Sequence, residues 1–222
     1  TYSRAEGDFH AENVRIGDGR IIFDLVSPFG NIPDIELGVP VSVNIENGIA
    51  AIALAQIAGA SAEEIRSGMA SFGGVDRRFD FHVKTDRMVY VSDYAHHPEE
   101  IRHCLESMKE LYSGRRIKVI FQPHLYTRTR DFYREFADAL SLVDDVCVVD
   151  IYPAREEPIP GVTSEIIFDK VNGPEKVLIT KEELMDYLKD EPIDTLITFG
   201  AGNIDRFIGP ITEMLCQRQQ DI

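Results

Sequence analysis

From Asp80 to the end of the chain, short apolar segments alternate with longer amphipathic ones. Segments such as MVYVSD, RIKVI and DTLITFG are rich in β-branched residues and predict strands, whereas PEEIRHCLESMKELY and TRTRDFYREFADALSLV predict helices. Apolar strands separated by helices indicate a mainly parallel sheet covered on both faces. This part of the chain is therefore predicted to be a Rossmann-like α/β domain.

The beginning of the chain has a different pattern. Residues 11–26 predict a hairpin with a glycine-containing turn, and a third strand is expected over 35–37. The apolar run at 48–58 predicts a buried helix. Ser61 is expected to cap a second helix that ends near Phe72. These elements predict an α/β segment made of hairpin strands followed by helices.

Two glycines, Gly73 and Gly74, separate the two patterns. The alternation of strands and helices begins soon after them, so we place a domain boundary near Arg78. One domain is expected over residues 1–78 and the other over residues 79–222.

The composition argues against several classes of function. The formal net charge of -15 disfavours binding to nucleic acid or to an anionic membrane surface. No apolar run approaches the roughly 20 residues that span a bilayer, and the first residues are not those of a signal peptide. The 3 cysteines lack CxxC spacing and are expected to be reduced, which points to the cytoplasm. Because the chain has no initiating Met, we expect a fragment or a processed product.

The segment FQPHLYTRTR follows the predicted strand RIKVI and contains His124, Arg128 and Arg130. Ligands bind at the carboxyl ends of strands in an open α/β sheet, and cations at that edge suit a carboxylate or a phosphate. The alternative is that the two arginines begin a helix and pair with its acidic residues on a solvated face. This segment alone favours neither interpretation.

The segment DYAHHP also follows a predicted strand, and it precedes a helix that Pro98 can open. Asp93, His96 and His97 could ligate a metal, but neighbouring histidines on an extended segment point in opposite directions. We therefore favour contact with a substrate over a metal site, with helix capping as the simpler alternative.

Three other segments carry polar groups or glycines. GAGN, at 200–203, can hold an anion on backbone N–H groups, although such a turn is more often a point of tight packing. The proline-containing segment 150–158 predicts a rigid loop near the same sheet edge or a plain surface loop. Asn44 and Asn47 lie three residues apart, on one side of a helix start, where two amides can bind a purine edge or cap the helix.

Together these segments resemble one family. The stretches NIENGIAAIA, GVDRRFDF, DYAHHPEE, FQPHLYTRTRDF, DIYPAREEPIPGVTS and TFGAGNID are similar to those of the Mur ligases. Within that family, HLYTRTRD and DIYPAREEPI resemble the members that join L-alanine to UDP-N-acetylmuramate. The AHHP element is shared with the enzyme that recycles murein tripeptide.

The resemblance implies a cytoplasmic, ATP-dependent enzyme of peptidoglycan synthesis with three domains. One domain holds the UDP sugar, the central one is an ATPase, and the C-terminal one is Rossmann-like and brings the amino acid. By this resemblance the chain is the end of the central domain followed by the whole third domain. The family's GKT phosphate loop, and the Glu and His that hold Mg²⁺, have no counterpart in the sequence. We therefore expect that the 222 residues alone do not catalyse ligation.

The resemblance also assigns residues to two groups. Those implied to bind the nucleotide are Asn44 and Asn47 at adenine, Arg78 near the phosphates of ATP, and Asp93. Those implied to bind L-alanine and the muramyl carboxylate are Tyr94, His96, His124 and Arg128, with Arg130 nearby. In an acyl-phosphate reaction Arg128 would stabilise charge that grows on oxygen, and His96 or His124 would take the ammonium proton. Val43 and Leu125 depart from the family, since His and Arg are usual at these positions.

Three other functions are compatible with the sequence. The first is the ligase of the same family that recycles murein tripeptide. The second is a non-catalytic Rossmann-type module that binds a nucleotide or metabolite, and the third is a divalent-metal protein that uses Asp93, His96 and His97. The preferred interpretation includes no metal ligand in this chain. Its partners are the small molecules UDP-N-acetylmuramate, L-alanine and ATP, and neither nucleic acid nor membrane. The oligomeric state stays open, as does selectivity among alanine, serine and glycine.

Overall fold

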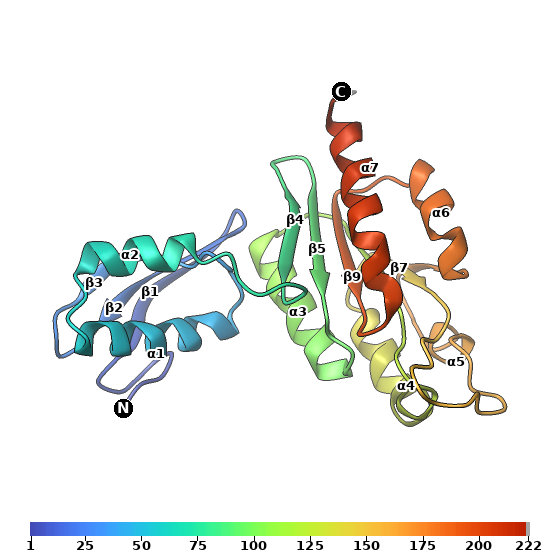
Figure 1. Ribbon diagram of the computed structural model, residues 1–222, viewed down its shortest axis with the longest axis horizontal. Helices are drawn as coiled ribbons and strands as arrows, with labels where there is room; N and C mark the ends of the chain where they lie inside the picture. The colour runs from blue at the N-terminus through green and yellow to red at the C-terminus, as the bar shows by residue number, and fades with distance from the viewer. Residues whose placement is uncertain (221–222) are drawn as a thin grey trace. The chain divides into compact units, whose positions relative to one another are not determined.

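A computed structural model of the protein describes residues 1–220. The chain divides into two compact units, Thr1–Val75 with Glu106–Gly114, and Asp76–Leu105 with Arg115–Ile222. Both contain a sheet and helices (Figure 1). Within the described residues, none of the helices is both long enough and apolar enough to cross a membrane.

The first unit has a three-stranded antiparallel sheet in the order β1-β2-β3 and two helices. The hairpin expected near its start is confirmed, and its turn places Asp18 and Gly19 at positive φ, a region that aspartate and glycine tolerate. The third strand begins a little earlier than expected. The elements are β1 (His10–Gly17), β2 (Arg20–Val26), β3 (Ile32–Glu36), α1 (Val43–Ile57) and α2 (Ala62–Ser71).

Helix α1 begins at Val43, before the start expected from the apolar run. The reason is that Ile45 joins Ile49 and Ile52 in one buried stripe at helical spacing, so burial extends the helix toward its amino end. Ser61 caps α2 as expected: its side chain accepts the Glu64 N–H, while the Glu64 carboxylate accepts the Ser61 N–H.

The second unit has a six-stranded sheet in the order β4-β5-β9-β6-β7-β8. Strand β4 is antiparallel to β5, and all other neighbours in the sheet are parallel, which confirms the predicted Rossmann-like architecture (Figure 1). The strands are β4 (Asp80–Lys84), β5 (Val89–Asp93), β6 (Ile117–Phe121), β7 (Asp145–Val148), β8 (Glu175–Leu178) and β9 (Thr195–Phe199). The helices are α3 (Pro98–Leu111), of which the residues from Glu106 on fall in the first unit, α4 (Tyr126–Leu140), α5 (Glu165–Phe168), η1 (Lys181–Glu183), α6 (Leu184–Asp190), η2 (Asn203–Phe207) and α7 (Ile208–Gln220).

Helices cover both faces of this sheet. Adjacent residues of a strand point to opposite faces, so Ile120 and Phe121 of β6 belong to different layers. Ile120 lies in an apolar cluster with Leu188 of α6 and Leu215 of α7. Phe121 packs on the other face, with its ring 5.1 Å from that of Phe136 in α4.

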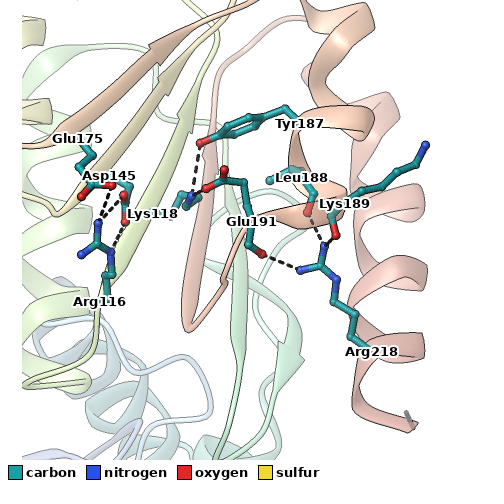
Figure 2. A network of polar contacts seen from close by, with 9 residues as sticks. All are labelled: Arg116, Lys118, Asp145, Glu175, Tyr187, Leu188, Lys189, Glu191 and Arg218. Atoms are coloured by element: carbon teal, nitrogen blue, oxygen red, sulfur yellow. Dashed lines mark hydrogen bonds and ion pairs between the residues drawn. The ribbon is translucent and has the colours of Figure 1, made fainter. Parts of the chain in front are cut away.

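A polar network lies at the amino-terminal edge of the sheet, where Lys118 is the second residue of β6 (Figure 2). The Lys118 side chain is buried, forms an ion pair with Glu191 and donates to the Tyr187 hydroxyl over 3.3 Å. Arg218 of α7 donates to backbone carbonyls at the end of α6, namely those of Leu188, Lys189 and Glu191. These contacts join α6 and α7 to the sheet at the edge opposite the carboxyl ends of the strands.

Candidate functional site

Three parallel strands bring the predicted site segments to one edge of the sheet. Strand β9 lies between β5 and β6, and its last residue Phe199 is in register with both Asp93 and Phe121. The segments that follow these three residues therefore leave the same edge. Val148 of β7 is in register with Phe121 and adds a fourth segment. This is the edge where ligands of open α/β sheets bind.

His124 lies at the centre of a cluster of side chains. Its ring stacks against that of Tyr152 at 5.7 Å and meets the edge of His96 at 6.0 Å. The Nη1 of Arg128 lies 3.4 Å from the Nδ1 of His124. A guanidinium group only donates, so this Nδ1 is the acceptor and the neutral ring carries its proton on Nε2.

The surroundings of His124 lower its pKa. Burial is the largest cause that lowers its pKa, and the positive charge of Arg128 and the neighbouring His96 act in the same direction. Glu156 acts in the opposite sense. The net effect is a pKa below the ordinary value for histidine.

His96 has the opposite arrangement of its ring nitrogens. Its Nδ1 lies 3.0 Å from the backbone carbonyl oxygen of Tyr94, and a carbonyl only accepts, so this Nδ1 carries a hydrogen. The neutral ring then has its lone pair on Nε2. Glu100 accepts the backbone N–H groups of His96 and His97 and so holds the start of α3.

The two neighbouring histidines separate, as the sequence predicted. His97 packs against Phe132 at 4.9 Å, whereas His96 contacts Tyr94 and His124. Across residues 1–220, no group of three or more His, Cys, Asp and Glu side chains is placed to hold a metal ion.

The two arginines of FQPHLYTRTR differ in their surroundings. Arg130 is exposed and its Nε pairs with the Asp131 carboxylate at 2.8 Å, as expected for a solvated helix face. Arg128 is half-buried, and no carboxylate of the described chain forms an ion pair with it. The solvated-face interpretation therefore fits Arg130, whereas binding of an anion by Arg128 stays a prediction.

Asp93 is held by the backbone on both sides. Its Oδ2 accepts the Phe79 N–H at 2.8 Å and its Oδ1 accepts the Ala95 N–H at 2.7 Å. Burial is the largest influence on this carboxyl and raises its pKa, although both hydrogen bonds and the charge of Arg78 oppose the increase. Arg78 itself is exposed.

Arg77 contacts the site segments, and the sequence did not single it out. Its guanidinium lies 4.9 Å from the centre of the Tyr94 ring, donates to the Gly200 carbonyl and lies 3.6 Å from the Asp205 carboxylate. It therefore joins the segment after β5 to the segment after β9. The adjacent arginines of GVDRRF are the only sequence signal, and they do not indicate which one turns inward.

The GAGN segment is packed against its neighbours. The buried side chain of Gln122 donates to Asn203 at 2.9 Å and accepts the Ile204 N–H at 3.0 Å. A Cβ placed on Gly202 would lie 2.5 Å from both the Gln122 Oε1 and the Tyr152 Cγ. These contacts agree with the alternative of tight packing at this turn.

The loop after β7 is tied to the start of α4. The Glu156 carboxylate accepts the Thr127 N–H at 2.9 Å and also the Thr127 hydroxyl. Tyr152 exchanges backbone hydrogen bonds with this region: its N–H donates to Pro123 at 2.8 Å, and its carbonyl accepts the Leu125 N–H at 3.0 Å. The loop is thus joined to the site segments and is more than a surface connection.

Asn44 and Asn47, in the first unit, lie on one side of α1 as predicted. The Asn47 amide donates to the Asn44 Oδ1 at 3.2 Å, and the Asn44 amide donates to the Val39 carbonyl, also at 3.2 Å. Neither is the cap of α1, because the N-cap position is Ser42. The capping alternative for these two residues is therefore wrong.

The chain is similar to known ligases in sequence. The family model described as "Mur ligase, glutamate ligase domain" matches residues 77–202. The chain is 62% identical over 216 residues to the UDP-N-acetylmuramate–L-alanine ligase of Phocaeicola vulgatus, covering 97% of this chain and 47% of that protein. The chain spans about half the length of the curated relatives it matches.

Solved structures have the same fold. The UDP-N-acetylmuramate–alanine ligase of Thermotoga maritima matches with a TM-score of 0.75 and 27% identity, covering 98% of this chain and 47% of that one. The MurF ligase of Thermotoga maritima, solved in complex with ADP, matches with a TM-score of 0.66 and 17% identity, covering 97% and 48%.

Proposed function

Since this chain belongs to the Mur ligase family, we propose that it is part of a cytoplasmic enzyme that joins L-alanine to the carboxylate of UDP-N-acetylmuramate in peptidoglycan precursor synthesis. The high identity to a relative with that name supports this substrate pair. Residues 1–78 would be the end of the central ATP-binding domain, and residues 79–222 the C-terminal domain that brings the amino acid.

The observation that carries the proposal is the environment of Arg128. This half-buried cation has no carboxylate partner in the described chain, and it touches His124 at the sheet edge where the site segments meet. A cation left without an internal anion is suited to bind one from a substrate. Both L-alanine and the muramyl group carry a carboxylate.

The reaction consists of two transfers. The γ-phosphoryl group of ATP passes to a carboxylate oxygen of UDP-N-acetylmuramate, which gives an acyl phosphate and ADP. The amine of L-alanine then attacks the acyl carbon, the bond from that carbon to the phosphate oxygen breaks, and phosphate leaves. Arg128 would stabilise the negative charge that grows on oxygen in this second step.

The two histidines are suited to different parts of the second step. His96 has its Nδ1 hydrogen directed at a carbonyl, so its Nε2 can take the proton that the attacking ammonium must lose. His124 accepts from Arg128 and presents an Nε2 hydrogen, so it can donate to a carboxylate or to the tetrahedral oxyanion. We therefore assign the general base to His96 and a hydrogen-bonding role to His124, with Tyr94 in contact with the His96 ring.

The remaining assignments concern the nucleotide. The paired amides of Asn44 and Asn47 are suited to an adenine edge, and exposed Arg78 to the phosphates of ATP. Asp93 would reach the nucleotide from the C-terminal domain. By the family resemblance, the ligands of Mg²⁺ would lie in another part of the enzyme.

The test measures ATP-dependent phosphate release by the full-length enzyme with UDP-N-acetylmuramate and each of L-alanine, L-serine and glycine. Release that requires L-alanine supports the proposal, and release without preference among amino acids argues against it. The 222-residue chain alone, which has no GKT sequence, is expected to release no phosphate. Activity of the isolated chain would contradict this division of roles.

A further inference from the structure

The amino end of α4 lacks a cap from its own segment. Leu125, at the N-cap position, has a φ of 73° and makes no side-chain cap hydrogen bond. The first N–H groups of a helix have no partner inside the helix and need an acceptor from elsewhere. Glu156 supplies that acceptor from the loop after β7, because its carboxylate receives both the N–H and the hydroxyl of Thr127.

The capped turn carries the site residues. Thr127 lies between His124 and Arg128 in the sequence, and the Thr129 hydroxyl closes the same turn by donating to the Leu125 carbonyl at 2.8 Å. Tyr152, from the same loop as Glu156, stacks on the His124 ring. One loop therefore holds both the backbone of this turn and the histidine at its beginning.

We propose that Glu156 is a positioning residue, which holds the first turn of α4 so that Arg128 and His124 face the substrate carboxylate. The identity of that substrate rests on the function proposed above, whereas the contact between Glu156 and Thr127 does not. Glu156 acts through Thr127 and the helix rather than by touching the substrate. Loss of this contact lets the turn move, and small displacements of a binding group reduce rates strongly.

The charge of Glu156 gives a second readout. The charged or titratable groups that act on His124 are Arg128 and His96, which lower its pKa, and Glu156, which opposes them. Replacing Glu156 by glutamine removes the opposing anion, so the pKa of His124 is expected to fall further. A residue with a purely structural role elsewhere in the fold would not move this pKa.

The first experiment uses the isotope-labelled 222-residue chain. NMR titration of His124 and amide hydrogen exchange at Thr127 and Arg128 are compared in wild type, Glu156→Gln and Thr127→Val. Glu156→Gln is expected to lower the pKa of His124 and to speed exchange in the turn. Thr127→Val keeps the carboxylate, so it should speed exchange and leave the pKa nearly unchanged.

The matched control is Glu157→Gln, which makes the same charge change at the neighbouring exposed residue. It is expected to alter neither the titration of His124 nor exchange in the turn. If Glu156→Gln and Glu157→Gln behave alike in both measurements, the proposal is overturned. Thr127→Val tests the same contact from the other side if Glu156→Gln folds poorly.

The second experiment measures ligation by the full-length enzyme. Glu156→Gln is expected to reduce kcat/KM for L-alanine about tenfold or more, and Glu157→Gln to leave it unchanged. A loss of activity in Glu156→Gln without faster exchange in the turn would overturn the positioning role. If the wild-type enzyme does not use L-alanine, the proposed function fails, and the titration and exchange results on the chain still decide the role of Glu156.

Discussion

The ammonium group of Lys118 forms an ion pair with the Glu191 carboxylate inside the second unit, where the lysine side chain is 3% exposed. Removing one partner of such a pair leaves a buried charge uncompensated. Glu191→Ala is therefore expected to lower the free energy of unfolding by about 3–5 kcal/mol. The measurement is urea denaturation of the chain followed by circular dichroism.

Two further variants separate burial of the charge from loss of a contact. The double variant Lys118→Met/Glu191→Leu removes both charges and should recover most of the loss. Lys189→Met breaks the exposed pair with Asp186 and should change stability little. A double variant as unstable as Glu191→Ala would show that packing, and not the unpaired charge, causes the loss.

Arg128 and Arg130 are expected to respond differently to replacement. Arg128→Ala removes the unpaired cation and should raise the KM of a carboxylate substrate about ten- to hundredfold, the range for loss of a hydrogen bond to a charged group. Arg130→Ala should have little effect, because that side chain is exposed and paired with Asp131. Steady-state kinetics of the full-length enzyme make the comparison, and equal effects of both variants would remove the distinction between the two arginines.

The assignment of the general base predicts a difference between two pH-rate profiles. His96→Asn should lower kcat. It should also abolish the decrease in rate at acidic pH (the acidic limb of the profile), which arises when the general base is protonated. His124→Asn should lower kcat and preserve that limb, because His124 is assigned as a donor. An unchanged limb in His96→Asn would exclude His96 as the base.

The charge of the Arg128 guanidinium should also affect the pKa of His124, which a titration can measure. Arg128→Met removes a positive charge that lowers the pKa of His124, so that pKa should rise toward its ordinary value. NMR titration of the chain measures it directly, and Arg130→Met serves as the control.

The same shift links stability to pH. His124 has a folded-state pKa below its ordinary value of 6.5, so as pH falls through 6.5 the unfolded chain takes up the proton first. The contribution of His124 to stability is thus complete above pH 6.5 and decreases as pH falls toward the folded-state pKa. Arg128→Met should reduce this decrease, which denaturation above and below pH 6.5 can test.

Gly202 is expected to tolerate no side chain. Gly202→Ala would place a Cβ 2.5 Å from both the Gln122 Oε1 and the Tyr152 Cγ, and such overpacking typically costs about 1–3 kcal/mol. Gly209→Ala, in α7, has open space and should be neutral or stabilising by about 0.5–1 kcal/mol. Thermal denaturation of both variants compares them, and equal stability would mean that the close contacts relax without cost.

The sequence predicted the fold class because the patterns that specify it are local. Apolar strands and helices alternate from Asp80, and a hairpin turn with Gly17 and Gly19 precedes them. The spacing of Asn44 and Asn47 placed the start of α1 correctly, whereas the apolar run began too late, since Ile45 lies outside that run and joins the core only at helical spacing. The order of the strands could not be predicted from local patterns, because the pairing of β9 with β5 depends on contacts between residues that are distant in the sequence.

The sequence could identify those candidate site residues that directly follow a predicted strand. His96, His124 and Arg128 follow strand ends, and the structure brings the first two within 6.0 Å of each other. The contacts of Arg77 with Gly200 and of Glu156 with Thr127 join separate loops. The sequence marked the segments that contain these residues, but only the folded arrangement shows which residue of each segment makes the contact.

The position of β9 has a consequence for how the second unit is made. This strand, the last in sequence order among the described residues, lies between β5 and β6 and is hydrogen-bonded to both, so the centre of the sheet stays open until Thr195–Phe199 has been synthesised. Until then β5 and β6 expose unpaired edges, which favour aggregation. The sheet can therefore close only after β9 has been synthesised.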